Sequence, residues 1–112
     1  MTALWTASDA ARACGGTLIG RDIALGGFST DSRAVTTGDL FVALRGERFD
    51  AHDFIADVQT AGAAAAVIAA DCAHTTGTLI RVADTRTALG DIARAWRNRF
   101  TLPLIGVTGS NG

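Results

Sequence analysis

The chain has 112 residues, which is long enough for one domain with a hydrophobic core. Apolar residues make up 48 % of it and charged residues 19 %, and this composition excludes an intrinsically disordered chain. The 10 basic residues, all of them arginine, are matched by 11 acidic ones. The resulting formal charge of -1 argues against a dedicated nucleic-acid binder, which normally carries a basic surplus.

The beginning of the chain predicts one short helix followed by short strands. Thr6 stands three residues before Asp9, which is a capping-box pattern, and alanines at helical spacing continue as far as Cys14. Gly15 and Gly16 then end the helix. Strands are predicted at residues 17–19, 23–25 and 40–44, and in a run from Phe28 that ends in a polar loop.

Helical and strand patterns alternate in the rest of the chain. A helix is expected from about Asp53 to Gly62, with a buried side made of Phe54, Ile55, Val58 and Ala61. Asp84 is expected to cap a longer helix with an apolar stripe of Leu89, Ile92, Ala93, Trp96 and Phe100. A buried strand is predicted at residues 64–69, and further strands are predicted at 78–83 and 104–107. This alternation indicates an α/β layer fold.

Cysteine spacing and hydropathy favour a cytoplasmic protein. Cys14 and Cys72 lack the spacing of a zinc site, and we expect both to be reduced core residues. The first residues lack the basic head and long apolar run of a signal peptide. Residues 63–70 form the longest run of small apolar residues and are too few to span a bilayer. We therefore expect a soluble, cytoplasmic protein with no membrane span.

The strongest local signal for function lies at the end of the sequence. The apolar run at 104–107 leads into a loop of Thr108, Gly109, Ser110, Asn111 and Gly112. Glycines let backbone N–H groups converge on phosphate oxygens, so the pattern favours the front half of an ATP loop. A complete loop would continue with a lysine and a serine or threonine. Taken alone, the same residues fit an ordinary glycine-rich turn equally well.

One plausible domain boundary lies at residues 101–103, where Pro103 follows the last predicted helix. Residues 1–101 are predicted to form a complete domain. Residues 102–112 are predicted to be the first strand and partial phosphate loop of a second, truncated domain. We therefore expect that this chain cannot turn over ATP by itself.

The loop after the strand at Phe28 combines two hydroxyl groups with one arginine. Thr30, Asp31, Ser32 and Arg33 suit a phosphate or sugar ligand, because hydroxyls and a guanidinium can both donate to its oxygens. The same residues also fit a plain surface turn in which Asp31 and Arg33 form an ion pair. Spacing alone favours this second interpretation.

A second charged loop, residues 45–53, follows the strand at 40–44. Loops that a scaffold positions often bind ligands, which makes this loop a candidate site. The alternative is a solvated connection in which Asp50 or Asp53 caps the next helix. His52 could act as a base, but the sequence identifies no cysteine or serine partner for it. A nucleophilic triad is therefore not expected.

Together these segments resemble the N-terminal domain of the Mur ligases over the whole length of the chain. The resemblance is carried by residues 28–33, 38–54, 62–67, 84–90 and 106–112. Each segment alone is unspecific, whereas the ordered set is highly specific. The sequence Glu-Arg-Phe-Asp-Ala-His-Asp-Phe at 47–54 favours the family member that adds D-alanyl-D-alanine. The sister ligase, which adds the third peptide residue, shares the Asp-Ser-Arg and Gly-Asp-Leu-Phe segments.

The resemblance implies a mixed sheet flanked by helices and a role in peptidoglycan-precursor synthesis. This domain would hold the UDP end of UDP-MurNAc-tripeptide within a three-domain, ATP-dependent ligase. ATP, Mg²⁺ and D-alanyl-D-alanine would bind only with the missing domains, so no cofactor is expected on this fragment. Two alternatives are the corresponding domain of the sister ligase and a stand-alone binding module without catalysis.

The resemblance also implies which residues bind. The UDP pocket would be lined by Thr30, Asp31, Ser32, Arg33, Arg45, Gly46, Asp50 and His52. The front half of the ATP loop would be Thr108, Gly109, Ser110, Asn111 and Gly112. No catalytic residue and no metal ligand is expected within these 112 positions.

Overall fold

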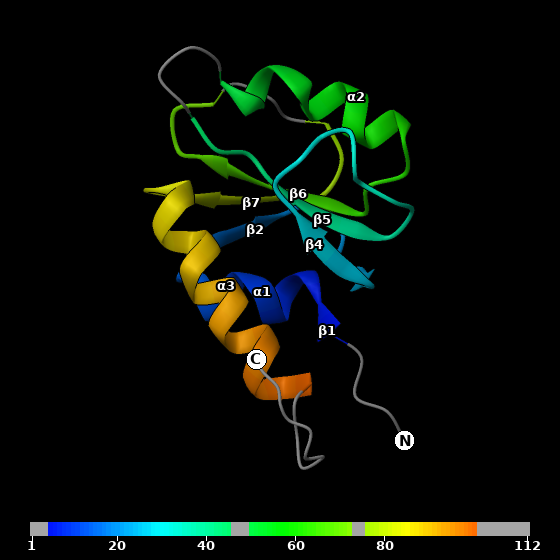
Figure 1. Ribbon diagram of the computed structural model, residues 1–112. Coiled ribbons are helices and arrows are strands. Elements are labelled where there is room, and N and C mark those ends of the chain that lie inside the picture. The colour runs from blue at the N-terminus through cyan, green and yellow to red at the C-terminus, as the bar shows by residue number, and fades with distance from the viewer. Residues whose placement is uncertain (1–4, 46–49, 73–75, 101–112) are drawn as a thin grey trace.

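A five-stranded sheet forms the centre of the computed structural model, which describes residues 5–45, 50–72 and 76–100 (Figure 1). Its strands are β2 (Thr17–Ile19), β4 (Gly27–Ser29), β5 (Asp39–Val42), β6 (Ala65–Ala69) and β7 (Leu79–Val82). They lie in the order β2-β7-β6-β5-β4. β4 to β7 are parallel, whereas β2 runs antiparallel to β7. The predicted α/β fold with a mixed sheet is confirmed.

Helices cover both faces of this sheet (Figure 1). They are α1 (Ala7–Cys14), the 3-10 turn η1 (Ala51–Phe54), α2 (Ile55–Thr60) and α3 (Thr85–Phe100). α1 and α3 pack on one face, while η1 and α2 pack on the other. Side chains of β5 alternate between the two layers, since Leu40 and Val42 face α1 and α3 whereas Phe41 faces η1 and α2. The core is therefore divided in two by the sheet.

The predicted ends of α1 and the predicted cap of α3 are confirmed. Thr6 Oγ1 accepts from the Asp9 N–H, and Asp9 Oδ2 accepts from the Thr6 N–H, which completes the capping box. α1 ends at Gly15, whose φ of 68° is the left-handed conformation that glycine adopts without steric cost. At α3, Asp84 Oδ1 accepts from the Arg86 N–H at 3.0 Å.

The two strands predicted at 17–19 and 23–25 flank one turn but do not pair with each other. β2 pairs with β7 in the large sheet. β3 (Ala24–Leu25) pairs instead with β1 (Trp5–Thr6) in a separate two-stranded sheet. Gly20 has a φ of 92° in the turn between them, and a Cβ there would lie 2.9 Å from the Gly77 carbonyl oxygen. The turn thus runs too close to a neighbouring loop for any larger residue.

The predicted buried side of the helix after Asp53 is partly wrong. Ile55 and Val58 are fully buried, but Ala61 is exposed and Phe54 keeps 36 % of its surface exposed. Successive residues of an α-helix are about 100° apart, so Phe54 and Ala61 lie about 100–120° round the helix axis from Ile55. Only the narrow face formed by Ile55 and Val58 of this short helix packs against the sheet.

An aromatic cluster joins the small sheet to α3 and the large sheet. Trp5 is 3 % exposed, and its ring stands edge-on to Trp96 with centroids 5.1 Å apart. The ring of Phe28 on β4 is also edge-on to Trp96, with centroids 5.8 Å apart. This confirms the predicted core position of Trp96 and adds Trp5 to the same core. Cys14 and Cys72 are free and half-buried, and burial raises the pKa of the Cys14 thiol.

No helix within the described ranges is both long enough and apolar enough to cross a bilayer. The strand predicted at 104–107, and with it the predicted boundary at 101–103, lies outside the described residues.

Candidate functional site

The four parallel strands end at one edge of the sheet, and a polar segment follows each of them. Residues 30–33 follow β4 and Arg45 follows β5, while Asp71 and Asp84 come after β6 and β7. In open α/β sheets, ligands bind in the crevice outside the carboxyl ends of the strands. Residues 30–33 and Arg45, which belong to the two loops that the sequence singled out, therefore lie at the edge where a ligand is expected.

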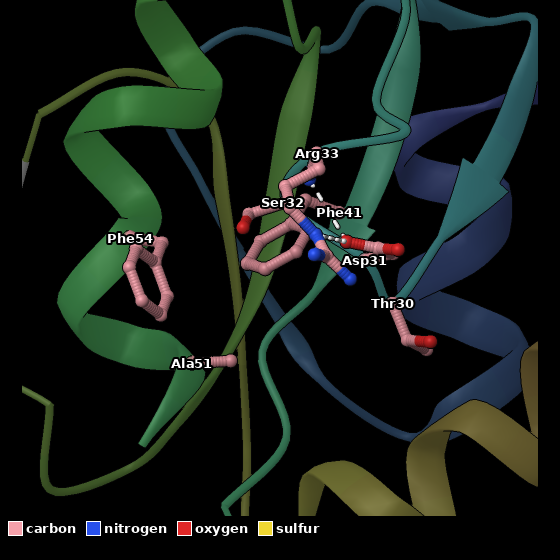
Figure 2. A pocket seen from close by; sticks show the side chains of 7 residues that line it. All are labelled: Thr30, Asp31, Ser32, Arg33, Phe41, Ala51 and Phe54. Atoms are coloured by element: carbon pink, nitrogen blue, oxygen red, sulfur yellow. Dashed lines mark hydrogen bonds and ion pairs between the residues drawn. The ribbon is translucent and has the colours of Figure 1, made fainter. Parts of the chain in front are cut away.

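The larger hollow at this edge has a volume of about 470 Å³. Its lining residues are Thr30, Asp31, Ser32, Arg33, Phe41, Ala51 and Phe54. Figure 2 shows Phe54 on the helical side of the hollow and the loop after β4 on the opposite side. Four of the predicted binding residues thus share one hollow with an aromatic wall. The volume falls within the range of about 300–1,000 Å³ that is typical of ligand pockets.

The loop after β4 is held by its own hydrogen bonds. Asp31 Oδ1 accepts from the Arg33 N–H at 2.9 Å and from Arg33 Nε at 3.3 Å. These bonds from Arg33, first of all that from its backbone, hold the pKa of Asp31 below its usual value. Arg33 is still 89 % exposed. The predicted surface pair exists, and it leaves most of the guanidinium facing solvent at the hollow's rim.

Arg45 lies apart from this hollow and borders a smaller one of about 100 Å³. The other lining residues there are Ala69, Ala83, Asp84, Thr85 and Arg86. Arg45 Nε donates to Asp50 Oδ2 at 3.0 Å, and Nη2 donates to Asp71 Oδ1 at 2.7 Å. Asp71 and then Asp50 raise the pKa of Arg45, and Arg45 in return lowers that of Asp71. Arg45 is therefore held by two carboxylates.

Asp50 and His52 line neither hollow. Asp50 caps η1 by accepting from the His52 N–H at 2.9 Å, which confirms the capping alternative for this residue. Partial burial acts to raise the pKa of Asp50, but hydrogen bonds from His52 and Arg45 outweigh it and lower that pKa. The His52 side chain is 7 % exposed and both of its ring nitrogens have partners. His52 thus offers a ligand no open ring nitrogen, and both carboxylate oxygens of Asp50 already accept hydrogen bonds from His52 or Arg45.

The remaining predicted residues fall outside the described part of the chain. Gly46 belongs to the 46–49 segment, and Thr108, Gly109, Ser110, Asn111 and Gly112 belong to the 101–112 segment. Their assignments stay predictions. Within the described ranges, no group of three or more His, Cys, Asp or Glu side chains is placed to hold a metal ion.

The apolar half of the larger hollow was not predicted from the sequence. Phe41 and Ala51 were not singled out as lining residues, and Phe54 was assigned to the core. The feature that could have identified these residues is their position, because β5 pairs with β4 and η1 is the next element after β5. Arg86 was also missed, although it follows the end of β7 at the same edge.

Comparison with known proteins gives a consistent family assignment. The family model described as Mur ligase family, catalytic domain, matches residues 25–97. Among curated proteins, the UDP-N-acetylmuramoyl-tripeptide--D-alanyl-D-alanine ligase of Synechocystis sp. is 47 % identical over 98 residues, which cover 86 % of this chain and 22 % of that one. The Escherichia coli K12 protein of the same name is 43 % identical over 97 residues, or 87 % and 21 % of the two chains.

A second ligase of the family is also similar. The UDP-N-acetylmuramoyl-L-alanyl-D-glutamate--2,6-diaminopimelate ligase of Geobacter sulfurreducens is 40 % identical over 91 residues, covering 79 % of this chain and 18 % of that protein. This chain therefore spans about a fifth of the length of the curated relatives it matches.

Solved structures agree with the fold. MurF from Acinetobacter baumannii superposes with a TM-score of 0.73 at 36 % identity, over 86 % of this chain and 22 % of that one. MurF from Thermotoga maritima in complex with ADP gives a TM-score of 0.57 at 34 % identity, over 66 % and 17 %.

Proposed function

This chain belongs to the Mur ligase family as a MurF-like fragment, and on that premise we propose that it docks the UDP end of a UDP-muramyl peptide. One observation carries the proposal. Four polar residues after β4 face an aromatic wall across a hollow of about 470 Å³ at the carboxyl edge of the sheet. Peptidoglycan-precursor synthesis is the setting that the relatives' names indicate.

The hollow offers the groups that a nucleoside diphosphate requires. A pyrimidine base has flat apolar faces, and one of them suits the partly exposed ring of Phe54, behind which Phe41 is fully buried. Sugar and base oxygens accept from hydroxyls such as those of Thr30 and Ser32. Phosphate oxygens pair with a guanidinium, and Arg33 keeps most of its own exposed at the rim. A ligand of this class would use both sides of the hollow.

The other parts of the reaction are assigned to the rest of such an enzyme. The relatives are several times longer than this chain, and the Thermotoga maritima structure holds ADP. We propose that ATP, Mg²⁺ and D-alanyl-D-alanine are bound by those further domains, that this fragment is not catalytic alone, and that it works in the cytoplasm. The same relatives support transfer of D-alanyl-D-alanine as the reaction.

A second candidate has a specific observation in its favour. Diaminopimelate-adding ligases match this chain at 40 % and 44 % identity, close to the values for the D-alanyl-D-alanine ligases. That candidate shares the UDP end of the substrate and differs in the peptide end and in the amino compound added. Docking of UDP by this domain is thus common to both candidates, and only an assay with the complete ligase separates them.

The test is a two-dimensional NMR titration of the 112-residue chain with UDP, and in parallel with ATP and Mg²⁺. We expect UDP to shift the amide signals of residues 30–33 and of Phe54, with a dissociation constant near 1 mM because one domain supplies only part of the contacts. ATP with Mg²⁺ should leave these signals in place.

Two matched variants sharpen this titration. Arg33→Gln should weaken the UDP shifts several-fold, whereas Arg94→Gln should not, because Arg94 lies on α3 and pairs with Asp91. UDP shifts confined to other elements, or equal effects of the two variants, would refute the proposed pocket.

A further inference from the structure

His52 lies inside the structure between η1 and the end of β6, and 7 % of its side chain is exposed. The Ala69 N–H donates to His52 Nε2 at 2.9 Å. A backbone amide can only donate, so Nε2 must carry a lone pair and the ring proton must sit on Nδ1. Nδ1 then donates to Asp50 Oδ1. The contacts on the two ring nitrogens therefore select a single tautomer, the neutral Nδ1–H form.

The Asp50 carboxylate passes this orientation on to Arg45. Its Oδ1 accepts from the ring and backbone of His52, while its Oδ2 accepts from Arg45 Nε at 3.0 Å. Arg45 Nη2 continues to Asp71 at 2.7 Å. Ala69 is the last residue of β6 and Asp71 follows it closely. We call this chain of hydrogen bonds the relay; it runs from Ala69 through His52, Asp50 and Arg45 to Asp71. Its first and last residues both lie at the end of β6, and it passes through Arg45 at the start of the loop after β5.

The strength of the relay is uneven along its length. Arg45 is 46 % exposed and Asp71 is 71 % exposed, and exposed ion pairs hold their geometry only weakly. A long arginine side chain also loses rotamer freedom when it is fixed in one place. The buried ring of His52, by contrast, is fixed at both nitrogens. The rigid part of the relay is thus the part furthest from solvent.

We propose that His52 is a positioning residue that, through Asp50, holds Arg45 at the smaller hollow for the phosphate end of a nucleoside diphosphate whose base lies in the larger hollow, without touching the ligand itself. The inference rests on the proposed UDP-docking function. Arg45 uses Nε and Nη2 for the two carboxylates, and Nη1 has no partner among the described residues. Arg86 lines the smaller hollow together with Arg45 and donates to the Arg45 carbonyl oxygen at 3.4 Å, which brings a second guanidinium to that hollow.

Two substitutions test the hydrogen bonds of the two ring nitrogens separately. In His52→Gln the amide oxygen can reach the position of Nε2 and accept from the Ala69 N–H, but the link to Asp50 is lost. In His52→Asn the amide nitrogen can reach the position of Nδ1 and donate to Asp50, but the Ala69 N–H loses its acceptor. If His52 had only a structural role, the Arg45 signal and the UDP affinity of both variants would change only in proportion to their loss of stability.

The measurements are made on the 112-residue chain by NMR, with UDP as the probe. A long-range proton–nitrogen correlation should show His52 as the Nδ1–H tautomer. The Arg45 Nε–H signal should be sharp in the unmodified chain and broadened in His52→Gln, which should also bind UDP about three- to tenfold more weakly. His52→Asn should keep more of the Arg45 signal and unfold at a lower denaturant concentration. Ile55→Val, which removes one buried methylene from α2, serves as the control for mild destabilisation.

Each outcome decides the inference. An Nε2–H tautomer, or an unchanged Arg45 signal and UDP affinity in folded His52→Gln, overturns it. If the histidine variants do not fold, Asp50→Asn breaks the link to Arg45 while an amide still caps η1, and an unchanged Arg45 signal there overturns the inference equally. If the unmodified chain shows no UDP shifts, the docking function fails. The tautomer and the Arg45 signal still test the relay in that case.

Discussion

Arg33 and Arg45, which follow β4 and β5 at the carboxyl edge of the sheet, are held in different ways. Arg33 is 89 % exposed, and its partner Asp31 stands two residues earlier in the same turn. Arg45 is 46 % exposed and is held by Asp50 and by Asp71, which lies 26 residues away. The first contact is local, whereas the second exists only while the ends of β5 and β6 lie side by side.

Because of this difference, Arg33 and Arg45 are expected to contribute differently to the stability of the fold and to ligand binding. A contact between near neighbours forms part of the time in the unfolded chain, so it adds little to the stability of the folded state. A contact between strands is lost on unfolding and contributes fully. Arg33 is thus available mainly for a ligand, while Arg45 also ties one strand end to another.

The largest expected effect on stability comes from removing a contact between distant segments of the chain. His52→Ala leaves the Ala69 N–H without its acceptor and opens a cavity beside η1. We expect the free energy of unfolding to fall by about 2–4 kcal/mol. Urea unfolding followed by circular dichroism measures it. Asp53→Ala, an exposed neighbour in the same turn, should leave the midpoint nearly unchanged. A loss of less than about 1 kcal/mol for His52→Ala would show that the ring is not an essential link.

The second effect compares the two arginines directly. Arg45→Gln should lower the urea midpoint, because two carboxylates lose their partner, while Arg33→Gln should leave it unchanged. Urea is the suitable denaturant because guanidinium salt would screen the ion pairs. The loss for Arg45→Gln should shrink as sodium chloride is added. Equal midpoints for the two variants would remove the distinction between the local and the tertiary pair.

The smallest effect concerns acid. The pKa values of Asp31 and Asp71 both lie below their usual value, owing first to the Arg33 backbone and to the Arg45 side chain respectively. A lowered folded-state pKa stabilises the fold above the unfolded-state pKa, and this stabilisation is lost as pH falls from about 4. Asp71→Asn should therefore flatten the acid loss of stability more than Asp31→Asn. Thermal unfolding between pH 5 and pH 2.5 would show it, and the reverse order would contradict the comparison.

Short-range features of the fold were predictable from the sequence. The capping box of Thr6 and Asp9, the glycine that ends α1 and the cap at Asp84 each depend on residues within four positions. The buried strands were recognisable because parallel strands covered on both faces are continuously apolar. The polar character of both loops was equally plain. These signals sufficed for the fold class and for the candidate loops.

Strand order decided what local patterns left open. No local pattern indicates that β2 pairs with β7 while β3 pairs with β1, because the partners lie far apart in the chain. Among the predicted site residues, residues 30–33 line one hollow and Arg45 lines another, since β4 stands at the edge of the sheet and β5 lies one place inside it.

His52 and Phe54 show the physical reason most clearly. A histidine in a polar loop suggests an accessible group. The ring of His52 is nevertheless buried, because it accepts the hydrogen bond of the Ala69 N–H, 17 residues later in the chain. A phenylalanine in a helical pattern suggests core, yet Phe54 borders the hollow because the helix is too short to bury more than one narrow face. Residue types and caps follow from the chain itself, whereas burial depends on which distant segment fills the space beside it.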